Sequence, residues 1–101
     1  MAHVIETVRF ELRDGIEEAA FLTLVKDMEP WLAKRDGFVA RRLAKDTAGQ
    51  WQDVVEWQTH DAAQAASQDM MKDPDMAGFL GAIKMDGVEM RHLDLRYTQD
   101  A

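Results

Sequence analysis

Residues 50–66 constrain the fold most strongly, because the hydrophobic period of the sequence changes in the middle of this stretch. Its first half alternates, and the odd positions hold mainly aromatic and β-branched residues: Trp51, Asp53, Val55, Trp57 and Thr59. Alternation with period two is typical of a strand with one buried face. Residues 61–66 are rich in helix formers, and Thr59 can cap a helix that begins after it. The sequence therefore predicts a strand that leads directly into a helix.

The other segments complete an alternating order of strands and helices. We expect strands over residues 4–12, 38–46 and 88–97, a helix over residues 16–28 that Pro30 interrupts, and a helix over residues 61–72. A further helical segment starts at Asp73 and Pro74 and closes near Gly81. Strand, helix, strand, strand, helix, strand is the order of a ferredoxin-like α+β fold. We expect one domain over residues 1–101, with the first strand between the third and the fourth in a four-stranded antiparallel sheet.

The face of this sheet that the helices leave uncovered is also apolar in the sequence. It is predicted to carry Ile5, Val39, Leu43, Val54, Leu93, Leu95 and Tyr97. Since a face of this kind is unfavourable in water, we expect a homodimer joined through the sheet.

Charge and composition exclude several function classes. The net charge of −7 argues against nucleic-acid binding, and the pairs Lys34–Arg35 and Arg41–Arg42 are expected to be solvated surface. The chain has no cysteine, which excludes disulfides and thiolate chemistry. No apolar run approaches membrane-spanning length, and the residues after Met1 are too charged for a signal peptide. We therefore expect a cytoplasmic protein that does not bind membranes.

Three polar residues interrupt apolar strand faces, and we take them as candidate catalytic residues. Glu6 lies between Val4 and Val8, Asp53 lies between Trp51 and Val55, and His92 shares a face with Met90. In the expected strand order these three residues lie on adjacent strands, where a carboxylate can act as a base and the imidazole as a proton relay. Two alternatives remain open. The residues can hold a divalent metal, or they can lie at the rim or form ion pairs with Arg42 or Arg91.

Large apolar side chains suggest either a ligand pocket or plain core. The candidate substrate-binding residues are Trp31, Phe38, Trp51, Trp57 and Phe79, accompanied by methionines at 28, 70, 71, 76, 85 and 90. Ser67 has no base at a readable spacing, and His60 is expected at the surface.

One combination of residues runs through nearly the whole chain: Pro30–Trp31, Gly37–Phe38, Trp51 and Trp57, Thr59 with the following His-Asp-Ala-Ala, Asp73–Pro74, and Phe79. Together these residues resemble a known family, the antibiotic biosynthesis monooxygenase-like proteins of the dimeric α+β barrel group. The resemblance implies a homodimer, a cavity between sheet and helices, and oxygen chemistry that needs no metal or other cofactor. The haem-degrading members carry an asparagine on the first strand, and this chain has no asparagine, which argues against haem degradation.

What the resemblance implies for function is a cofactor-independent monooxygenase-like enzyme that acts on a small aromatic or polycyclic phenol or quinol. Glu6 or Asp53 would be the base and His92 the proton relay, with Trp51, Trp57 and Phe79 as walls of the pocket. The alternative is a non-catalytic dimer that binds a small hydrophobic or aromatic ligand or has a structural role.

Overall fold

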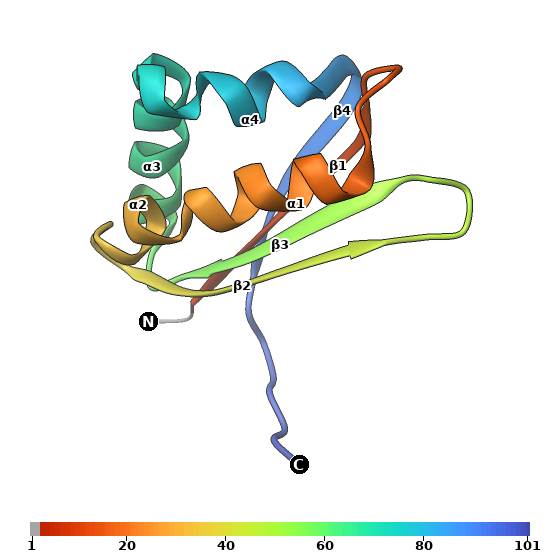
Figure 1. Ribbon diagram of the computed structural model, residues 1–101. Coiled ribbons are helices and arrows are strands. Elements are labelled where there is room, and N and C mark those ends of the chain that lie inside the picture. The colour runs from red at the N-terminus through yellow and green to blue at the C-terminus, as the bar shows by residue number, and fades with distance from the viewer. Residues whose placement is uncertain (1–2) are drawn as a thin grey trace.

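The computed structural model describes residues 3–101 and shows an antiparallel four-stranded sheet with all of its helices on one face (Figure 1). Met1 and Ala2 lie outside the described residues. The elements in chain order are β1 (Val4–Leu12), α1 (Glu18–Asp27), α2 (Glu29–Ala33), β2 (Phe38–Lys45), β3 (Trp51–Trp57), α3 (His60–Lys72), the 3-10 helix η1 (Pro74–Met76), α4 (Ala77–Ala82) and β4 (Ile83–Asp94).

The strands lie in the order β2-β3-β1-β4, which confirms the predicted ferredoxin-like topology. β1 is therefore a central strand, and it pairs with β3 on one side and with β4 on the other. The register places Glu6 opposite Val55 of β3 and opposite His92 of β4. Arg41 of β2 lies opposite Val55 in turn, so one row of side chains crosses all four strands.

Local sequence signals explain most of the element boundaries. The Thr59 side chain accepts a hydrogen bond from the Ala62 backbone N–H at 3.0 Å, so Thr59 caps α3 as predicted. Pro30 lies in the first turn of α2, and the helical segment is interrupted at Met28 between α1 and α2. Gly37 follows α2 with φ of +81°, a left-handed conformation that favours glycine.

The last strand begins earlier than the sequence predicts. β4 starts at Ile83 rather than at Val88, and Asp86 and Gly87 lie inside it. The pairing of β1 with β4 shifts register between Arg9 and Glu11, so β4 bulges there, and Gly87 has φ of +83°. The Asp-Gly pair therefore makes an irregularity within a strand instead of the turn that precedes one.

Aromatic side chains build one end of the core between the sheet and the helices. Phe21 of α1 is fully buried and contacts Trp51 edge-to-face, with ring centroids 5.0 Å apart. Phe10 and Phe79 also pack on Phe21, at 5.8 Å and 5.6 Å between centroids. A second group of buried residues lies around Trp57 at the other end of the sheet: Leu32, Val55, Ala63 and Ala66. These two clusters hold the helices on the sheet from both ends.

The uncovered face of the sheet is less apolar than predicted. Ile5 and Leu93 are opposite each other on this face, and Val54 lies nearby. Leu43 was predicted there but packs on the helix side against the aromatic core, because a register shift between Phe38 and Ala40 exchanges the faces of β2. Beyond β4 the chain runs away from the body towards the C-terminus, with Tyr97 76% exposed (Figure 1).

None of the helices within residues 3–101 has both the length and the apolar character needed to cross a membrane.

Candidate functional site

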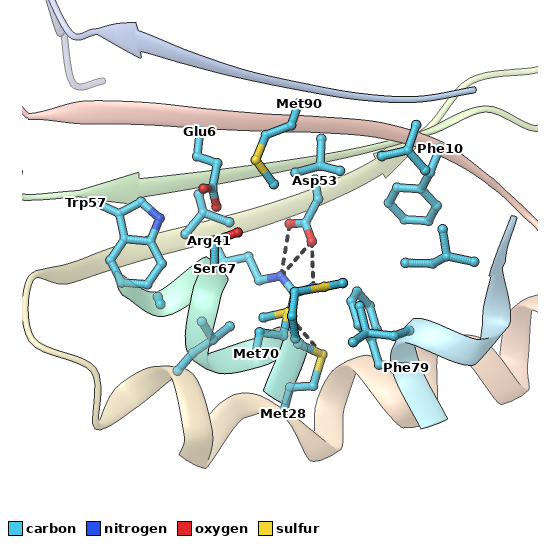
Figure 2. A pocket seen from close by; sticks show the side chains of 18 of the residues that line it. Glu6, Phe10, Met28, Arg41, Asp53, Trp57, Ser67, Met70, Phe79 and Met90 are labelled. Carbon is cyan, nitrogen blue, oxygen red and sulfur yellow. Dashed lines mark hydrogen bonds and ion pairs between the residues drawn. The ribbon is translucent and has the colours of Figure 1, made fainter. Parts of the chain in front are cut away.

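A cavity of about 150 Å³ lies between the sheet and the helices. Its walls are almost entirely apolar and come from all four strands and from α2, α3 and α4. Five methionines contribute to the lining: Met28, Met70, Met71, Met85 and Met90. The few polar side chains on the wall are Glu6, Arg41, Asp53 and Ser67 (Figure 2). An apolar cavity with a few convergent polar groups is the usual form of a small-molecule site.

One of these polar groups, Asp53, is bound by Arg41 from the neighbouring strand. The Arg41 Nε donates to Asp53 Oδ1 at 2.9 Å, and Arg41 Nη2 donates to Asp53 Oδ2 at 2.6 Å. The two side chains are only 11% and 9% exposed. Figure 2 shows both projecting from the sheet into the cavity. The ion pair therefore satisfies both charges inside a largely apolar site.

The second carboxylate, that of Glu6, has a histidine as its partner. Glu6 is 7% exposed, and one of its oxygens, Oε2, lies 2.8 Å from His92 Nε2. His92 does not line the cavity itself but contacts Glu6 from the side of β4. Its ring also meets the ring of His60 at the start of α3 edge-to-face, with centroids 5.0 Å apart. Since His60 is exposed, the three side chains connect the cavity to solvent.

The indole nitrogen of Trp57 is an unpaired donor in the cavity wall. Among residues 3–101, Trp57 Nε1 is the buried side-chain polar atom that has no hydrogen-bond partner, and Trp57 is 2% exposed. Trp57 and Glu6 are diagonal neighbours on the same face of β3 and β1. Figure 2 shows the nitrogen on the side of the ring that faces Glu6. Buried donors are nearly always paired in native proteins. Because this N–H has no partner within residues 3–101, it can donate a hydrogen bond to a ligand.

The structure thus brings together five of the predicted site residues and separates three. Glu6, Asp53, Trp57 and Phe79 line the cavity, and His92 contacts Glu6 behind it. The other three lie elsewhere. Trp51 is part of the aromatic core, Phe38 packs edge-to-face on Trp57 from outside the cavity, and Trp31 lies at the end of the helical layer.

Trp31 has a structural contact instead. Its Nε1 donates to Asp73 Oδ2 at 2.8 Å, and Arg35 stacks on its ring. The pKa of Asp73 is held below its ordinary value, first by the Asp75 backbone N–H and then by this Trp31 hydrogen bond and the charge of Arg35. Asp73 is therefore a helix-capping residue that links η1 to α2.

Sequence reasoning missed the role of Arg41 and assigned the ion pairs differently. The sequence predicts Arg41 and Arg42 at the surface, and it leaves an ion pair with Arg42 or Arg91 open as an alternative for the polar residues of the strand faces. Arg42 lies opposite Val54 on the uncovered face, whereas the shift between Phe38 and Ala40 turns Arg41 inwards. Ser67 and Met70 of α3 also reach the cavity, and only their helical spacing from Ala63 and Ala66 signals this in the sequence. Within residues 3–101 no group of three or more acidic or histidine side chains is arranged to hold a metal ion.

Comparison with solved structures shows which proteins share this fold. A putative antibiotic biosynthesis monooxygenase from Bordetella bronchiseptica superimposes with a TM-score of 0.79 at 16% identity, over 96% of this chain and 100% of that one. SnoaB, a cofactor-independent oxygenase from Streptomyces nogalater, gives a TM-score of 0.73 at 18% identity, over 97% of both chains. The monooxygenase from the gene ActVA-Orf6 of Streptomyces coelicolor, solved with the ligand nanaomycin D, gives 0.69 at 14% identity, over 99% of this chain and 93% of that one.

By sequence, no family model and no curated protein matches the chain. The structural similarity extends over nearly the whole length on both sides, at identities that define the fold alone. The chain therefore has the ferredoxin-like fold of the antibiotic biosynthesis monooxygenase structures, and its resemblance to that family is confirmed at the level of the fold.

Proposed function

We propose that this protein is a cofactor-independent monooxygenase-like enzyme that acts on a small aromatic phenol or quinol. The observation that carries the proposal is the buried Glu6 carboxylate, which faces an apolar cavity and is hydrogen-bonded to a histidine that leads towards solvent. The shared fold supports it, because neighbours with this fold are described as a monooxygenase and a cofactor-independent oxygenase.

In the proposed reaction Glu6 removes the proton of a ring hydroxyl, and His92 passes that proton on towards His60 and solvent. The phenolate then transfers an electron to dioxygen, and the two radicals combine to form a C–O bond at a ring carbon. Loss of the hydrogen on that carbon breaks the O–O bond. One oxygen atom stays in the product as a carbonyl, and the other leaves as water. The aromatic substrate is the reductant, so the balance requires no other electron donor.

The roles of the remaining residues follow from their placement. Trp57 Nε1 supplies a hydrogen bond to the substrate oxygen, and Phe79 provides part of the apolar wall. Asp53 is the weaker candidate for the base, because Arg41 already holds both of its oxygens. Trp31, Phe38 and Trp51 have no place in this proposal, since they lie outside the cavity.

The proposal is tested by oxygen uptake with a panel of hydroquinones, compared for the wild type and two variants. Glu6→Gln keeps the shape of the side chain but removes the base, so we expect uptake to fall roughly 10²–10⁴-fold. Glu11→Gln is the matched control, because Glu11 is exposed on the same strand. Uptake by Glu6→Gln at the wild-type rate would exclude Glu6 as the base. Binding of the hydroquinones with no uptake above the blank would instead identify a non-catalytic binding protein.

We also infer that two copies associate through the uncovered face of the sheet. Ile5, Val54 and Leu93 form an apolar group on that face, and the C-terminal segment presents the exposed Tyr97 beyond it. Charged side chains surround this group, including the ion pair between Arg9 and Glu89. An apolar centre with a polar rim is the usual composition of a protein interface.

A further inference from the structure

The size of the cavity restricts what it can hold. Its volume is about 150 Å³, whereas pockets for drug-sized ligands measure roughly 300–1,000 Å³. An apolar cavity of roughly 150 Å³ engineered into another protein binds benzene. The most exposed lining residues are Met71, Met85 and Met90, so the cavity opens to solvent between α3 and β4. One aromatic ring fits inside, with a substituent directed to this mouth.

The charges in the cavity restrict the ligand further. Arg41 is the cation on the wall, and Asp53 already occupies its Nε and Nη2. A ligand carboxylate would therefore meet the Glu6 carboxylate, and the described lining residues include no further cation to compensate it. A ligand ammonium would face the Glu6 carboxylate, but it carries no lone pair and would leave the Trp57 N–H unpaired. An uncharged ligand avoids both penalties.

A hydroxyl group matches two unpaired hydrogen-bonding atoms of the cavity wall, Trp57 Nε1 and Glu6 Oε1. It accepts a hydrogen bond from Trp57 Nε1 through its oxygen and donates its own hydrogen to a carboxylate. Glu6 uses Oε2 for His92, and no hydrogen bond to its Oε1 occurs within residues 3–101. Because Trp57 and Glu6 are diagonal neighbours on one sheet face, both lie at the same end of the cavity (Figure 2).

We propose that the cavity selects an uncharged phenol or hydroquinone with a single ring, held by its hydroxyl between Trp57 and Glu6. This inference rests on the proposed function for the site and names its substrate class. It excludes fused polycyclic ligands, because the cavity as built does not contain the space for a second ring.

The test is a binding series measured by isothermal titration calorimetry on the purified chain. The probes are 4-ethylphenol, 4-ethyltoluene with a methyl group in place of the hydroxyl, 4-ethylbenzoate with a carboxylate in that place, 4-ethylbenzylamine with an ammonium group in that place, and 1-naphthol with a second ring. We expect 4-ethylphenol to bind about tenfold or more tightly than each of the others, the difference expected when a buried group is left unpaired. Equal or tighter binding of 1-naphthol, or of either charged probe, would overturn the inference, and so would no binding of any probe.

A pair of tryptophan variants tests the hydroxyl contact. Trp57→Phe removes the free N–H and should abolish the preference for 4-ethylphenol over 4-ethyltoluene. Trp31→Phe is the control, because its N–H is bound to Asp73 outside the cavity, and it should keep the preference. A preference unchanged in Trp57→Phe would overturn the proposed contact.

Oxygen uptake measured with one-ring and two-ring phenols and hydroquinones distinguishes a failure of this inference from a failure of the proposed function. If 4-ethylphenol binds selectively but no phenol or hydroquinone consumes oxygen, the enzyme proposal fails and the ligand class stands. If only bicyclic hydroquinones consume oxygen, the ligand class fails and the enzyme proposal stands.

Discussion

At the scale of single residues, two carboxylates on the same sheet face have different hydrogen-bond partners. Asp53 is held by Arg41 through both oxygens, in an ion pair that is almost completely buried. Glu6 has one oxygen bonded to His92 and lies beside the unpaired Trp57 N–H. The alternation of the sequence predicts that both carboxylates interrupt apolar strand faces, but it does not show that their hydrogen-bond partners differ. Their partners place Asp53 in a closed ion pair and leave one oxygen of Glu6 without a hydrogen bond within residues 3–101.

The Arg41–Asp53 pair gives a prediction about stability. Arg41→Met or Asp53→Leu leaves the other charge buried without a partner, and we expect each to lower the free energy of unfolding by about 3–5 kcal/mol. The double variant Arg41→Met/Asp53→Leu removes both charges and should recover most of this loss. Urea denaturation of the four proteins gives the coupling energy directly. Losses in the single variants that simply add in the double variant would show that the pair is not coupled.

At the scale of elements, the approach of α3 to the start of β2 depends on one glycine. A Cβ atom on Gly37 would lie 2.7 Å from the Cβ of Ala62 in the first turn of α3. Gly37 also accepts a hydrogen bond from the Gln58 backbone N–H at 2.7 Å, which joins the end of β3 to the segment before β2. The strand and helix of residues 50–66 therefore pack closely against the segment before β2, because Gly37 has no side chain.

Gly37→Ala should therefore destabilise the fold more than the same change at a free turn. Gly49→Ala is the matched control, because Gly49 has φ of +85° and a Cβ atom there would meet nothing within 4 Å beyond its chain neighbours. Both variants incur the cost of a left-handed residue, about 1–2 kcal/mol, and only Gly37→Ala adds the collision with Ala62. Thermal and urea unfolding of the two variants measures the difference. Equal losses at the two positions would mean that α3 moves aside at little cost.

At the scale of the whole molecule, the helices cover one face of the sheet and leave the other uncovered (Figure 1). Antiparallel sheets can face water on one side, so the open face does not by itself require a second copy. Its apolar group at Ile5, Val54 and Leu93, together with the exposed Tyr97, is what favours a homodimer.

The homodimer prediction is tested with two leucines of similar exposure on opposite sides of the molecule. Leu93 is 44% exposed on the open face, and Leu22 of α1 is 42% exposed on the helix side. We expect sedimentation velocity to show a dimer for the wild type at micromolar concentration. Leu93→Lys should raise the dimer dissociation constant by about tenfold or more, because it places a charge at the centre of the interface. Leu22→Lys should leave association unchanged. A stable wild-type monomer would exclude the dimer.

The sequence by itself determined the local features of this protein. The strands around Glu6 and Asp53 and the Thr59 cap follow from short-range periodicity and backbone preference. Together with the rules of strand connection they were sufficient for the element order and for the place of β1 in the sheet. They also identified Glu6, Asp53 and His92 as polar residues on the covered face.

Only the tertiary structure decided which of these residues meet and what they enclose. The register shift between Phe38 and Ala40 turns Arg41 towards Asp53 and turns Arg42 away, and no local preference in β2 signals it. The bulge around Gly87 likewise lies inside β4, where the Asp86–Gly87 pair alone predicts a turn before the strand. Strand pairing is set by contacts between segments far apart in the chain, and one extra residue exchanges the two faces. The cavity and its polar end depend on that pairing, which is why periodicity identified the residues but not their partners.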